Sequence, residues 1–408
     1  MNVERRRVDP AHLEVPRVGR VVACEGPLPW ALLDGAGAAH GGVEEFLRQL
    51  VARDCAASSV RSYAMALLRW LRFLWVLEVA WDRPGRGDVR DFVLWMRSAV
   101  PSRPVRGGGA GGLNARTGKP YLGGVFAPST INHNLAVVSE FYDHHIARGT
   151  GPLVNPVPAR ASERGGRAFE HHNPLEPFRP GRRAAFRQKV PATAPRAMPD
   201  ELFDELFAAM SSDRDRALLA FYVSCGARPA ELLGLHGARV DVGEQLVGVV
   251  RKGTRELQWL PASPDAFVWL LLYRTGLPEE LAGPDQPVWW TLRKPYRPLG
   301  YDALRAVLRR ANARLGTNWT VHDLRHTFAV RMAADPNVPL TTLQTLLGHA
   351  WLTTTQRYLN PRMEQVLQQA RAHAAQAAEP RPAVPRAAVG YEDEDLRELF
   401  GRRLGPSW

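Results

Sequence analysis

Cysteine is scarce in this sequence. The 408 residues contain three cysteines, which lie far apart and show no CxxC spacing: Cys24, Cys55 and Cys225. This pattern supports neither a disulfide framework nor a zinc knuckle, so we expect a protein of a reducing compartment.

Long hydrophobic runs and a secretory leader are also missing. The most apolar long stretch, residues 64–81, contains Arg69, Arg72 and Glu78, charges that a membrane span rarely tolerates. The first ten residues, MNVERRRVDP, include no apolar segment of the kind found in signal peptides. We therefore expect a cytoplasmic protein with no membrane partner.

Acidic residues are outnumbered by basic ones. There are 53 Lys+Arg against 41 Asp+Glu, which gives a formal net charge of +12. This excess favours a polyanionic partner, although a merely basic soluble protein would show it too. Arginine predominates over lysine, which suits bidentate phosphate contacts, but a high genomic G+C content is the larger expected cause.

Motifs for metals and nucleotides are lacking. The glycine-rich stretch 103–120 follows no predicted strand and ends without GK[ST], so a flexible surface loop is favoured over a phosphate-cradling loop. His322 and His326 have the i, i+4 spacing of a metal pair, but HDLRH lacks the glutamate of HExxH and a third ligand. His326 is therefore interpreted as a hydrogen-bonded core residue, and we expect neither a metal nor a cofactor.

Hydrophobic periodicity predicts four helices in the first 150 residues. They are expected from Gly42 to about Arg53, from Ser58 or Ser59 onward, from Asp88 onward, and from Ser129 to His145. The fourth opens with a polar cluster that would either contact DNA or be a solvated helix end: Thr130, Asn132, His133 and Asn134. Residues 1–40 show no period and are expected to form a poorly ordered arm.

The second half begins with two predicted helices, followed by GARPAELLGL. Pro229 suits the first position of a helix, which places Arg228 at its cap beside free N–H groups. Glu231 in the first turn would either pin Arg228 or interact favourably with the helix dipole. The segments QLVGVV and ELQWLP predict two strands joined by a tight turn around Lys252, whose side chain could swing into a cleft.

The most informative stretch is residues 320–358, TVHDLRHTFAVRMAADPNVPLTTLQTLLGHAWLTTTQRY. Its opening TVHD has the pattern of a capping box and predicts a helix start. His322 and Arg325 share one face of the first turns, where free N–H groups and the helix dipole favour an anion. The stretch therefore predicts a phosphate pocket, to which a second short helix would bring Tyr358.

Several ordered motifs in this sequence resemble those of one family. HDLRH, LLGHA and TTTQRY resemble the signature of the tyrosine recombinases, the phage-integrase family, of the site-specific integrase or mobile-element transposase type. CGARPAELLGL resembles the first-arginine motif, and VVRKGTRELQWLP resembles the lysine hairpin. Such an ordered set rarely arises by chance. The resemblance implies the following catalytic residues, of which the last is the nucleophile: Arg228, Lys252, His322, Arg325, His349 and Tyr358.

The resemblance covers residues 200–375 well and residues 40–150 loosely. It implies a mainly α protein with an N-terminal four-helix core-binding domain (SAM-like). A C-terminal α+β catalytic domain of tyrosine-recombinase type, with a small antiparallel sheet, would follow. We expect an N-terminal arm at 1–40, a helical DNA-binding domain at 41–150, a basic Pro/Arg-rich linker at 151–197, a catalytic domain at 198–378 and a C-terminal tail at 379–408. The linker would either cross the DNA backbone or be solvated, and the tail would dock on another protomer or fold back.

The implied function is site-specific DNA recombination through a 3′-phosphotyrosyl intermediate, independent of metal and ATP. Arg228 and Arg325 would hold the nonbridging oxygens, and Lys252 would protonate the 5′ oxygen. His322 is the nearest candidate base, and His349 would contact a nonbridging oxygen or orient Tyr358. Expected partners are double-stranded DNA and other protomers in a tetrameric synapse, in the bacterial cytoplasm. The alternatives are relaxation of the type IB topoisomerase kind and a non-cleaving DNA-binding relative.

Overall fold

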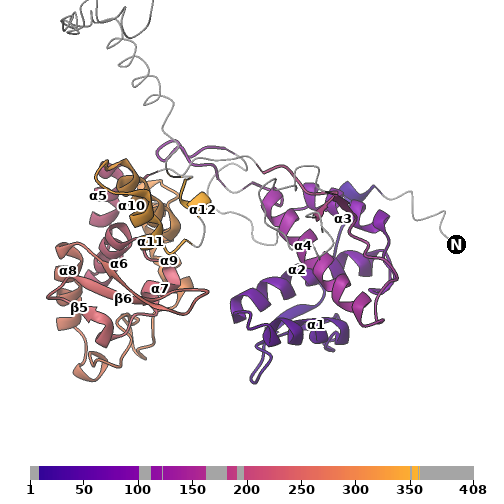
Figure 1. Ribbon diagram of the computed structural model, residues 1–408, viewed down its shortest axis with the longest axis horizontal. Helices are drawn as coiled ribbons and strands as arrows, with labels where there is room; N and C mark the ends of the chain where they lie inside the picture. Colours follow the sequence, from indigo (N-terminus) through magenta and orange to yellow (C-terminus); the bar gives the residue numbers. More distant parts are fainter. Residues whose placement is uncertain are drawn as a thin grey trace, which may run out of the picture. The chain divides into compact units, whose positions relative to one another are not determined.

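The computed structural model describes residues 9–100, 112–121, 123–161, 182–190, 197–349, 352–356 and 358. The chain divides into two compact units (Figure 1). Unit 1 comprises Met1–Thr193, Met198–Ser211 and Gly300–Val321, and unit 2 comprises Ala194–Ala197, Ser212–Leu299 and His322–Trp408. The described part is mostly helical with small antiparallel sheets, as predicted. Among its helices, none combines the length and the apolar character that crossing a membrane requires.

Unit 1 contains four helices where hydrophobic periodicity predicts them. They are α1 (Gly41–Ala52), α2 (Ala57–Val76), α3 (Arg86–Ser98) and α4 (Pro128–Ala147). Their apolar stripes meet in one core with large aromatic side chains at its centre: Phe46, Trp70, Phe73, Phe92 and Phe141. The indole N–H of Trp70 donates to the Tyr142 hydroxyl (2.7 Å), which donates to the Trp81 carbonyl (2.8 Å). These two bonds pair the polar atoms of the buried Trp70 and Tyr142 side chains.

The N-terminal segment corrects an expectation. Residues 1–40 were expected to be poorly ordered, but from Asp9 onward they form regular elements: η2 (Pro10–His12), β1 (Arg20–Ala23) and β2 (Trp30–Leu33). The antiparallel β1–β2 hairpin lies on α2, and η2 lies on α3. Arg72 of α2 donates to the carbonyls of Val18 (2.6 Å) and Gly19 (2.7 Å). Strands of four residues hold too few positions to show a clear period, which explains why periodicity missed them.

The polar cluster at the start of α4 is engaged within unit 1. The amide of Asn132 both donates to and accepts from the backbone of Gln188, at 3.0 and 2.7 Å. His133 Nε2 lies 2.9 Å from Ser62 Oγ, and the buried Asn134 donates to the carbonyl of Thr130 (2.7 Å). Three of the four side chains thus make contacts within unit 1, and contact of this cluster with DNA remains a prediction.

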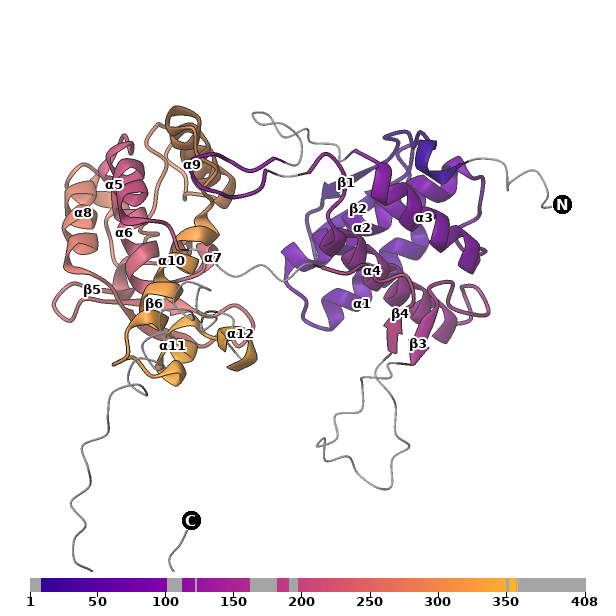
Figure 2. The same cartoon turned by 90° about the horizontal axis from the view of Figure 1, so that it is seen from above.

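The remainder of unit 1 joins distant stretches of sequence. Strands β3 (Ala159–Ala161) and β4 (Arg182–Ala184) pair antiparallel (Figure 2). Helices α5 (Asp200–Ala208) and α9 (Tyr301–Leu315) lie together. The described part of the glycine-rich stretch is tied to them, because Asn114 donates to Gly316 O (2.9 Å) and Arg116 pairs with Glu205 (2.7 Å). Residues 162–181 and 191–196 of the expected linker and the whole expected tail lie outside the described residues. The expected domain boundaries remain predictions.

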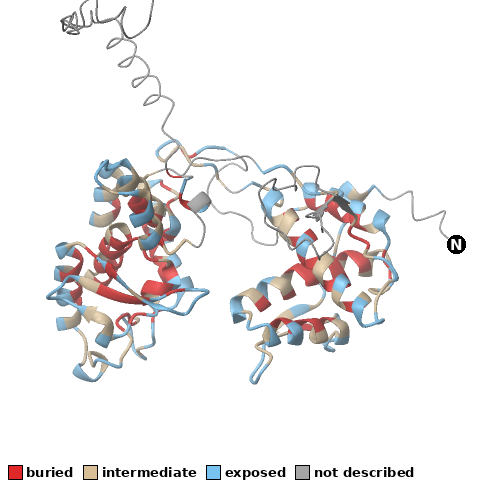
Figure 3. Ribbon diagram, viewed as in Figure 1, coloured by how far each residue is buried: buried red, intermediate tan, exposed pale blue. Residues whose placement is uncertain are grey.

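Unit 2 combines helices with a three-stranded antiparallel sheet of order β5-β6-β7. Its elements are α6 (Asp213–Cys225), α7 (Pro229–Leu233), η3 (Gly237–Arg239), β5 (Val240–Asp241), β6 (Leu246–Val250), β7 (Leu257–Pro261), α8 (Pro264–Thr275), η4 (Glu279–Leu281), α10 (Val321–Ala334), α11 (Leu340–Leu347) and α12 (Leu352–Gln356). Buried residues are concentrated in α6 and β6 (Figure 3). Trp289 stacks on Tyr273 and donates its N–H to Leu232 O (2.8 Å), which anchors α7 beside the site described next.

Candidate active site

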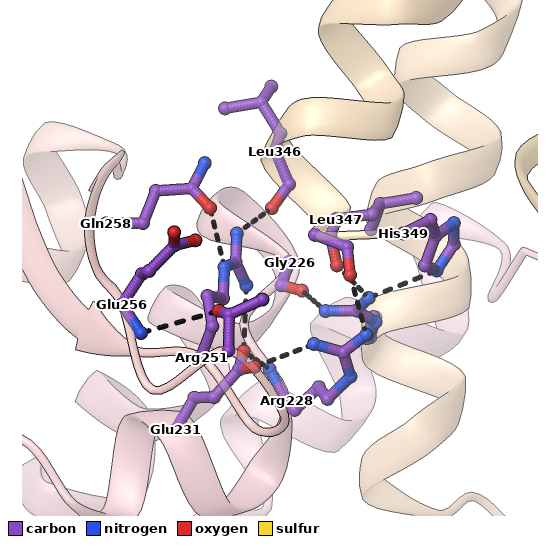
Figure 4. A network of polar contacts seen from close by, with 12 residues as sticks. Gly226, Arg228, Glu231, Arg251, Glu256, Gln258, Leu346, Leu347 and His349 are labelled. Atoms are coloured by element: carbon purple, nitrogen blue, oxygen red, sulfur yellow. Dashed lines mark hydrogen bonds and ion pairs between the residues drawn. The ribbon is translucent and has the colours of Figure 1, made fainter. Parts of the chain in front are cut away.

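Four segments of unit 2 converge on one site: the α6–α7 junction, the β6–β7 turn, α10 and the end of α11 with His349 (Figure 4). Helix α6 ends at Gly226, whose φ is +63°. A Cβ at this position would lie 2.2 Å from Phe328 of α10, so only glycine permits this approach. Arg228 follows as the N-cap of α7, with Pro229 at the first helical position, as predicted.

Arg325 projects from α10 into this junction. Its side chain is buried and donates to the carbonyls of Gly226 (2.5 Å) and Leu347 (2.6 Å). Burial and, next, the charge of Arg228 lower the pKa of Arg325 to about 10. The guanidinium is therefore still protonated at neutral pH, so two positive charges are held close together.

Glu231 connects this pair of cations to the sheet. Its carboxylate accepts the backbone N–H (2.9 Å) and the Nη1–H (2.7 Å) of Arg228, so it does pin that arginine. It also accepts from Arg251 Nη1 (2.9 Å). Burial alone would raise the pKa of Glu231, but the hydrogen bonds from Arg228 and the charges of Arg251 and Arg228 hold that pKa below its usual value. The carboxylate thus stays ionised between two arginines.

The histidine of LLGHA and the final tyrosine lie together beside Arg325. His349 Nε2 is 3.3 Å from Arg325 Nη2, and His349 Nδ1 is 2.9 Å from Thr355 Oγ1. The Tyr358 ring stacks nearly parallel to the His349 ring, with 6.3 Å between their centroids. Tyr358 is 9% exposed. The structure therefore brings Arg228, Arg325, His349 and Tyr358 into one cluster.

His326 is hydrogen-bonded, as expected, but its partner brings it into the candidate site. The Tyr358 hydroxyl lies 2.9 Å from His326 Nδ1, whereas the expected nearest base was His322. Burial and then the charge of Arg325 lower the pKa of His322, so it stands close to the cluster. The signal was present in the sequence, because His322, Arg325 and His326 occupy positions i, i+3 and i+4 of one helix face. The i, i+4 spacing had been considered only for a metal.

Lys252 occupies the turn between β6 and β7, as predicted, and is exposed. Within the described part of the chain, the structure gives its ammonium group no hydrogen-bond partner. Gly253, with a φ of +117°, allows the turn to close. Lys252 therefore lies at the edge of the site, on the exposed β6–β7 turn, and is not part of the buried cluster.

A group of three potential metal ligands occurs in unit 1, and two of them are engaged in other contacts. Suitable atoms of Glu45, His144 and His145 lie within 4.8 Å of one another. His145 uses both ring nitrogens, at 2.8 Å from Thr150 Oγ1 and 3.0 Å from Gly42 O. Glu45 pairs with Arg148 (2.5 Å). His145 and Glu45 are thus engaged in other contacts, whereas the buried Nε2 of His144 has no hydrogen-bond partner among the described residues.

Residues 198–365 match the phage integrase family. Tyrosine recombinase XerC of Chromobacterium violaceum is 34% identical over 171 residues, which are 40% of this chain and 55% of that protein. Tyrosine recombinase XerD of Pseudomonas aeruginosa is 31% identical over 171 residues, 40% of this chain and 57% of that protein. The chain thus spans about half the length of these curated relatives.

Two solved structures share the fold. An integrase of the Tn1549 transposon, in complex with circular intermediate DNA, gives a TM-score of 0.54 at 15% identity and covers 82% of this chain and 98% of its own. A lambda integrase dimer bound to a COC′ core site gives a TM-score of 0.52 at 14% identity and covers 79% of this chain and 77% of its own. The predicted mainly α fold with a small antiparallel sheet is therefore the tyrosine-recombinase fold. Residues 198–365 of this chain thus match the phage integrase family, and the curated relatives named above are tyrosine recombinases.

Proposed function

We propose that this protein is a site-specific DNA recombinase, an integrase or transposase that cuts and rejoins DNA strands through a 3′-phosphotyrosyl intermediate. The observation that carries the proposal is one cluster in unit 2, in which the Tyr358 hydroxyl contacts His326, the Tyr358 ring stacks on His349, and His349 lies beside Arg325. The relatives named above are bacterial recombinases. The lambda integrase dimer on its core site and the Tn1549 integrase–DNA complex support DNA and other protomers as partners. Our proposal places these partners in the bacterial cytoplasm and the protomers in a tetrameric synapse on double-stranded DNA.

Arg228 and Arg325 would hold the scissile phosphate. A guanidinium has five N–H donors, more than the contacts of either side chain with the described residues require. The two cations repel one another, and this repulsion adds to burial in lowering the pKa of Arg325. A phosphate with its nonbridging oxygens between them would relieve this repulsion, and His349 stands beside Arg325 as a further donor.

The covalent step then moves two protons. The Tyr358 oxygen attacks phosphorus and its proton passes to a histidine, which by distance is His326, with His322 on the same helix face as the alternative. The bond from phosphorus to the 5′ oxygen breaks, and Lys252 protonates that oxygen. The products are a 3′-phosphotyrosine and a free 5′ hydroxyl. An incoming 5′ hydroxyl reverses the step, and the covalent link conserves the bond energy, so ATP is not needed.

Unit 1 offers a second contact for DNA. A pocket of about 420 Å³ is lined by Arg17, Arg61, Arg69 and Arg72, and no carboxylate belongs to its described lining. Burial and then the charge of Arg72 lower the pKa of Arg69. Arg61 lies over the Trp30 ring at 4.9 Å. Clustered arginines without counter-ions are suited to backbone phosphates, so this pocket supports DNA binding by the N-terminal half.

Trapping of a covalent protein–DNA adduct tests the proposal. Wild-type protein, incubated with DNA from the ends of a candidate mobile element, should give an adduct that survives denaturation. Tyr358→Phe should give none and should bind DNA nearly as well. Tyr301→Phe, at an exposed tyrosine of α9, is the matched control and should form the adduct.

The same reagents separate the alternatives. A normal adduct from Tyr358→Phe would refute the assignment of the nucleophile, and loss of the adduct in Tyr301→Phe would transfer the role to Tyr301. A supercoiled plasmid with two target sites distinguishes the reactions. Strand exchange supports a recombinase, relaxation alone supports topoisomerase-like chemistry, and binding without an adduct supports a non-cleaving relative.

A further inference from the structure

Arg251 lies next to Lys252 and forms the base of the β6–β7 turn. Its backbone N–H donates to Glu256 O (2.9 Å), and its carbonyl accepts the N–H of Arg255 (3.0 Å). The turn that carries Lys252 is closed by these two bonds. Contacts that hold Arg251 in place therefore also hold the backbone from which the Lys252 side chain extends.

The side chain of Arg251 is buried, which is unusual for an arginine at the end of a strand. Its guanidinium donates to Gln258 Oε1 (2.6 Å), Glu231 Oε2 (2.9 Å) and the Leu346 carbonyl (2.5 Å), with a longer bond to the Thr345 carbonyl (3.5 Å). Figure 4 shows it between β7, α7 and the end of α11. One side chain thus connects three separate segments of the site.

The end of α11 fits closely against this guanidinium. Gly348 ends the helix with a φ of +57°, and a Cβ on it would lie 2.8 Å from Arg251 Nε and 3.0 Å from its Cζ. The last carbonyls of a helix have no partner within the helix and carry its negative dipole end. Arg251 supplies a donor and a positive charge there, and the next residue after Gly348 is His349.

We infer that Arg251 is a positioning residue for DNA cleavage, which holds the turn bearing Lys252 against the end of α11 that bears His349 and, through Glu231, against Arg228. The inference rests on the proposed function, in which Lys252 protonates the leaving oxygen. A planar guanidinium can meet three acceptors in fixed directions, whereas the ammonium group of lysine cannot. Loss of this connection would let the turn move, and a displacement of about 1 Å can cost about 10²-fold in rate.

The leaving atom provides a readout that a purely structural role would not change. A 5′ bridging oxygen needs a proton in order to leave, whereas a bridging sulfur leaves as thiolate without one. Displacement of Lys252 therefore slows cleavage of the oxygen substrate and has little effect on the sulfur substrate. A general loss of folded protein slows both equally.

The experiment measures the rate of adduct formation on a nicked half-site with oxygen or sulfur at the 5′ bridge. The variants are Arg251→Lys, which keeps the charge, and Arg251→Met, which keeps much of the volume. Arg255→Lys is the matched control, since Arg255 lies exposed on the same turn. Melting temperature and DNA affinity are measured alongside. If both Arg251 variants unfold, Gln258→Ala, which removes one contact of the guanidinium, takes their place.

Both Arg251 variants should form the adduct about 10²-fold more slowly than wild type on the oxygen substrate. The sulfur substrate should restore most of the lost rate. Arg255→Lys should keep the wild-type ratio of the two rates. Addition of Arg251→Lys to Lys252→Ala should cause little further loss on oxygen, because both changes act through one group.

Two results would overturn the inference in different ways. If sulfur rescues Lys252→Ala but not the Arg251 variants, or if the two losses add, Arg251 does not act through Lys252 and the proposed function stands. If sulfur fails to rescue Lys252→Ala itself, the proposed role of Lys252 is wrong, and the positioning role of Arg251 falls with it.

Discussion

Replacement of Glu231 by glutamine should destabilise unit 2 far more than its single lost charge suggests. The carboxylate is 4% exposed and bonds both Arg228 and Arg251. Removal of one member of a buried ion pair typically costs about 3–5 kcal/mol, because the partner charge stays buried without compensation. Arg228 is 29% exposed at its side chain, so water screens part of its charge. We therefore expect a loss near the lower end, about 3 kcal/mol.

The loss of stability caused by Glu231→Gln should become smaller as the pH is lowered. The folded-state pKa of Glu231 lies below its unfolded value, so its contribution to stability is fully present above the unfolded pKa, about 4.3. The contribution disappears as the pH falls through the lowered folded-state pKa. The difference between wild type and Glu231→Gln should thus be largest near neutral pH and shrink in acid.

Urea unfolding, followed by tryptophan fluorescence, to which the buried Trp289 of unit 2 contributes, measures this difference. Glu244→Gln is the matched control, because Glu244 is exposed beside the same sheet and should change stability by less than about 0.5 kcal/mol. A loss from Glu231→Gln of under about 1 kcal/mol, the range of exposed pairs, would refute the reasoning. A difference that stays constant down to strongly acidic pH would do so too.

Two further predictions concern the protons and the DNA. His326→Ala should slow adduct formation by about 10²–10⁴-fold without changing DNA affinity; if His322→Ala costs more under the same single-turnover conditions, His322 is the base. Arg61→Gln in the unit 1 pocket should lower the slope of log affinity against log salt by about 1, measured by binding titrations, with Arg48→Gln on the exposed face of α1 as control. An unchanged slope would mean that Arg61 does not contact DNA.

The sequence predicted those parts of the fold that depend on local patterns. The stripes of α1 to α4, the cap position of Arg228 and the turn at Lys252 follow from spacing within a few residues. The inward course of Arg251 could not be predicted in this way, because its acceptors come from Glu231 and from the end of α11, far away in sequence. The contact of His326 with Tyr358 likewise depends on where α12 places the tyrosine.

The contacts at the end of α11 restrict which insertions and deletions this helix can tolerate. Carbonyls of consecutive residues there accept from different arginines: Leu346 from Arg251, Leu347 from Arg325 and Gly348 from Arg228. Each residue of an α-helix advances the chain by about 1.5 Å and turns it by about 100°. One residue inserted into or deleted from α11 would therefore point all of these carbonyls elsewhere at once. Side chains on the outer face of α11 can therefore change, but the length of the helix must stay constant. That length determines the positions of the three guanidinium groups that bind its last carbonyls.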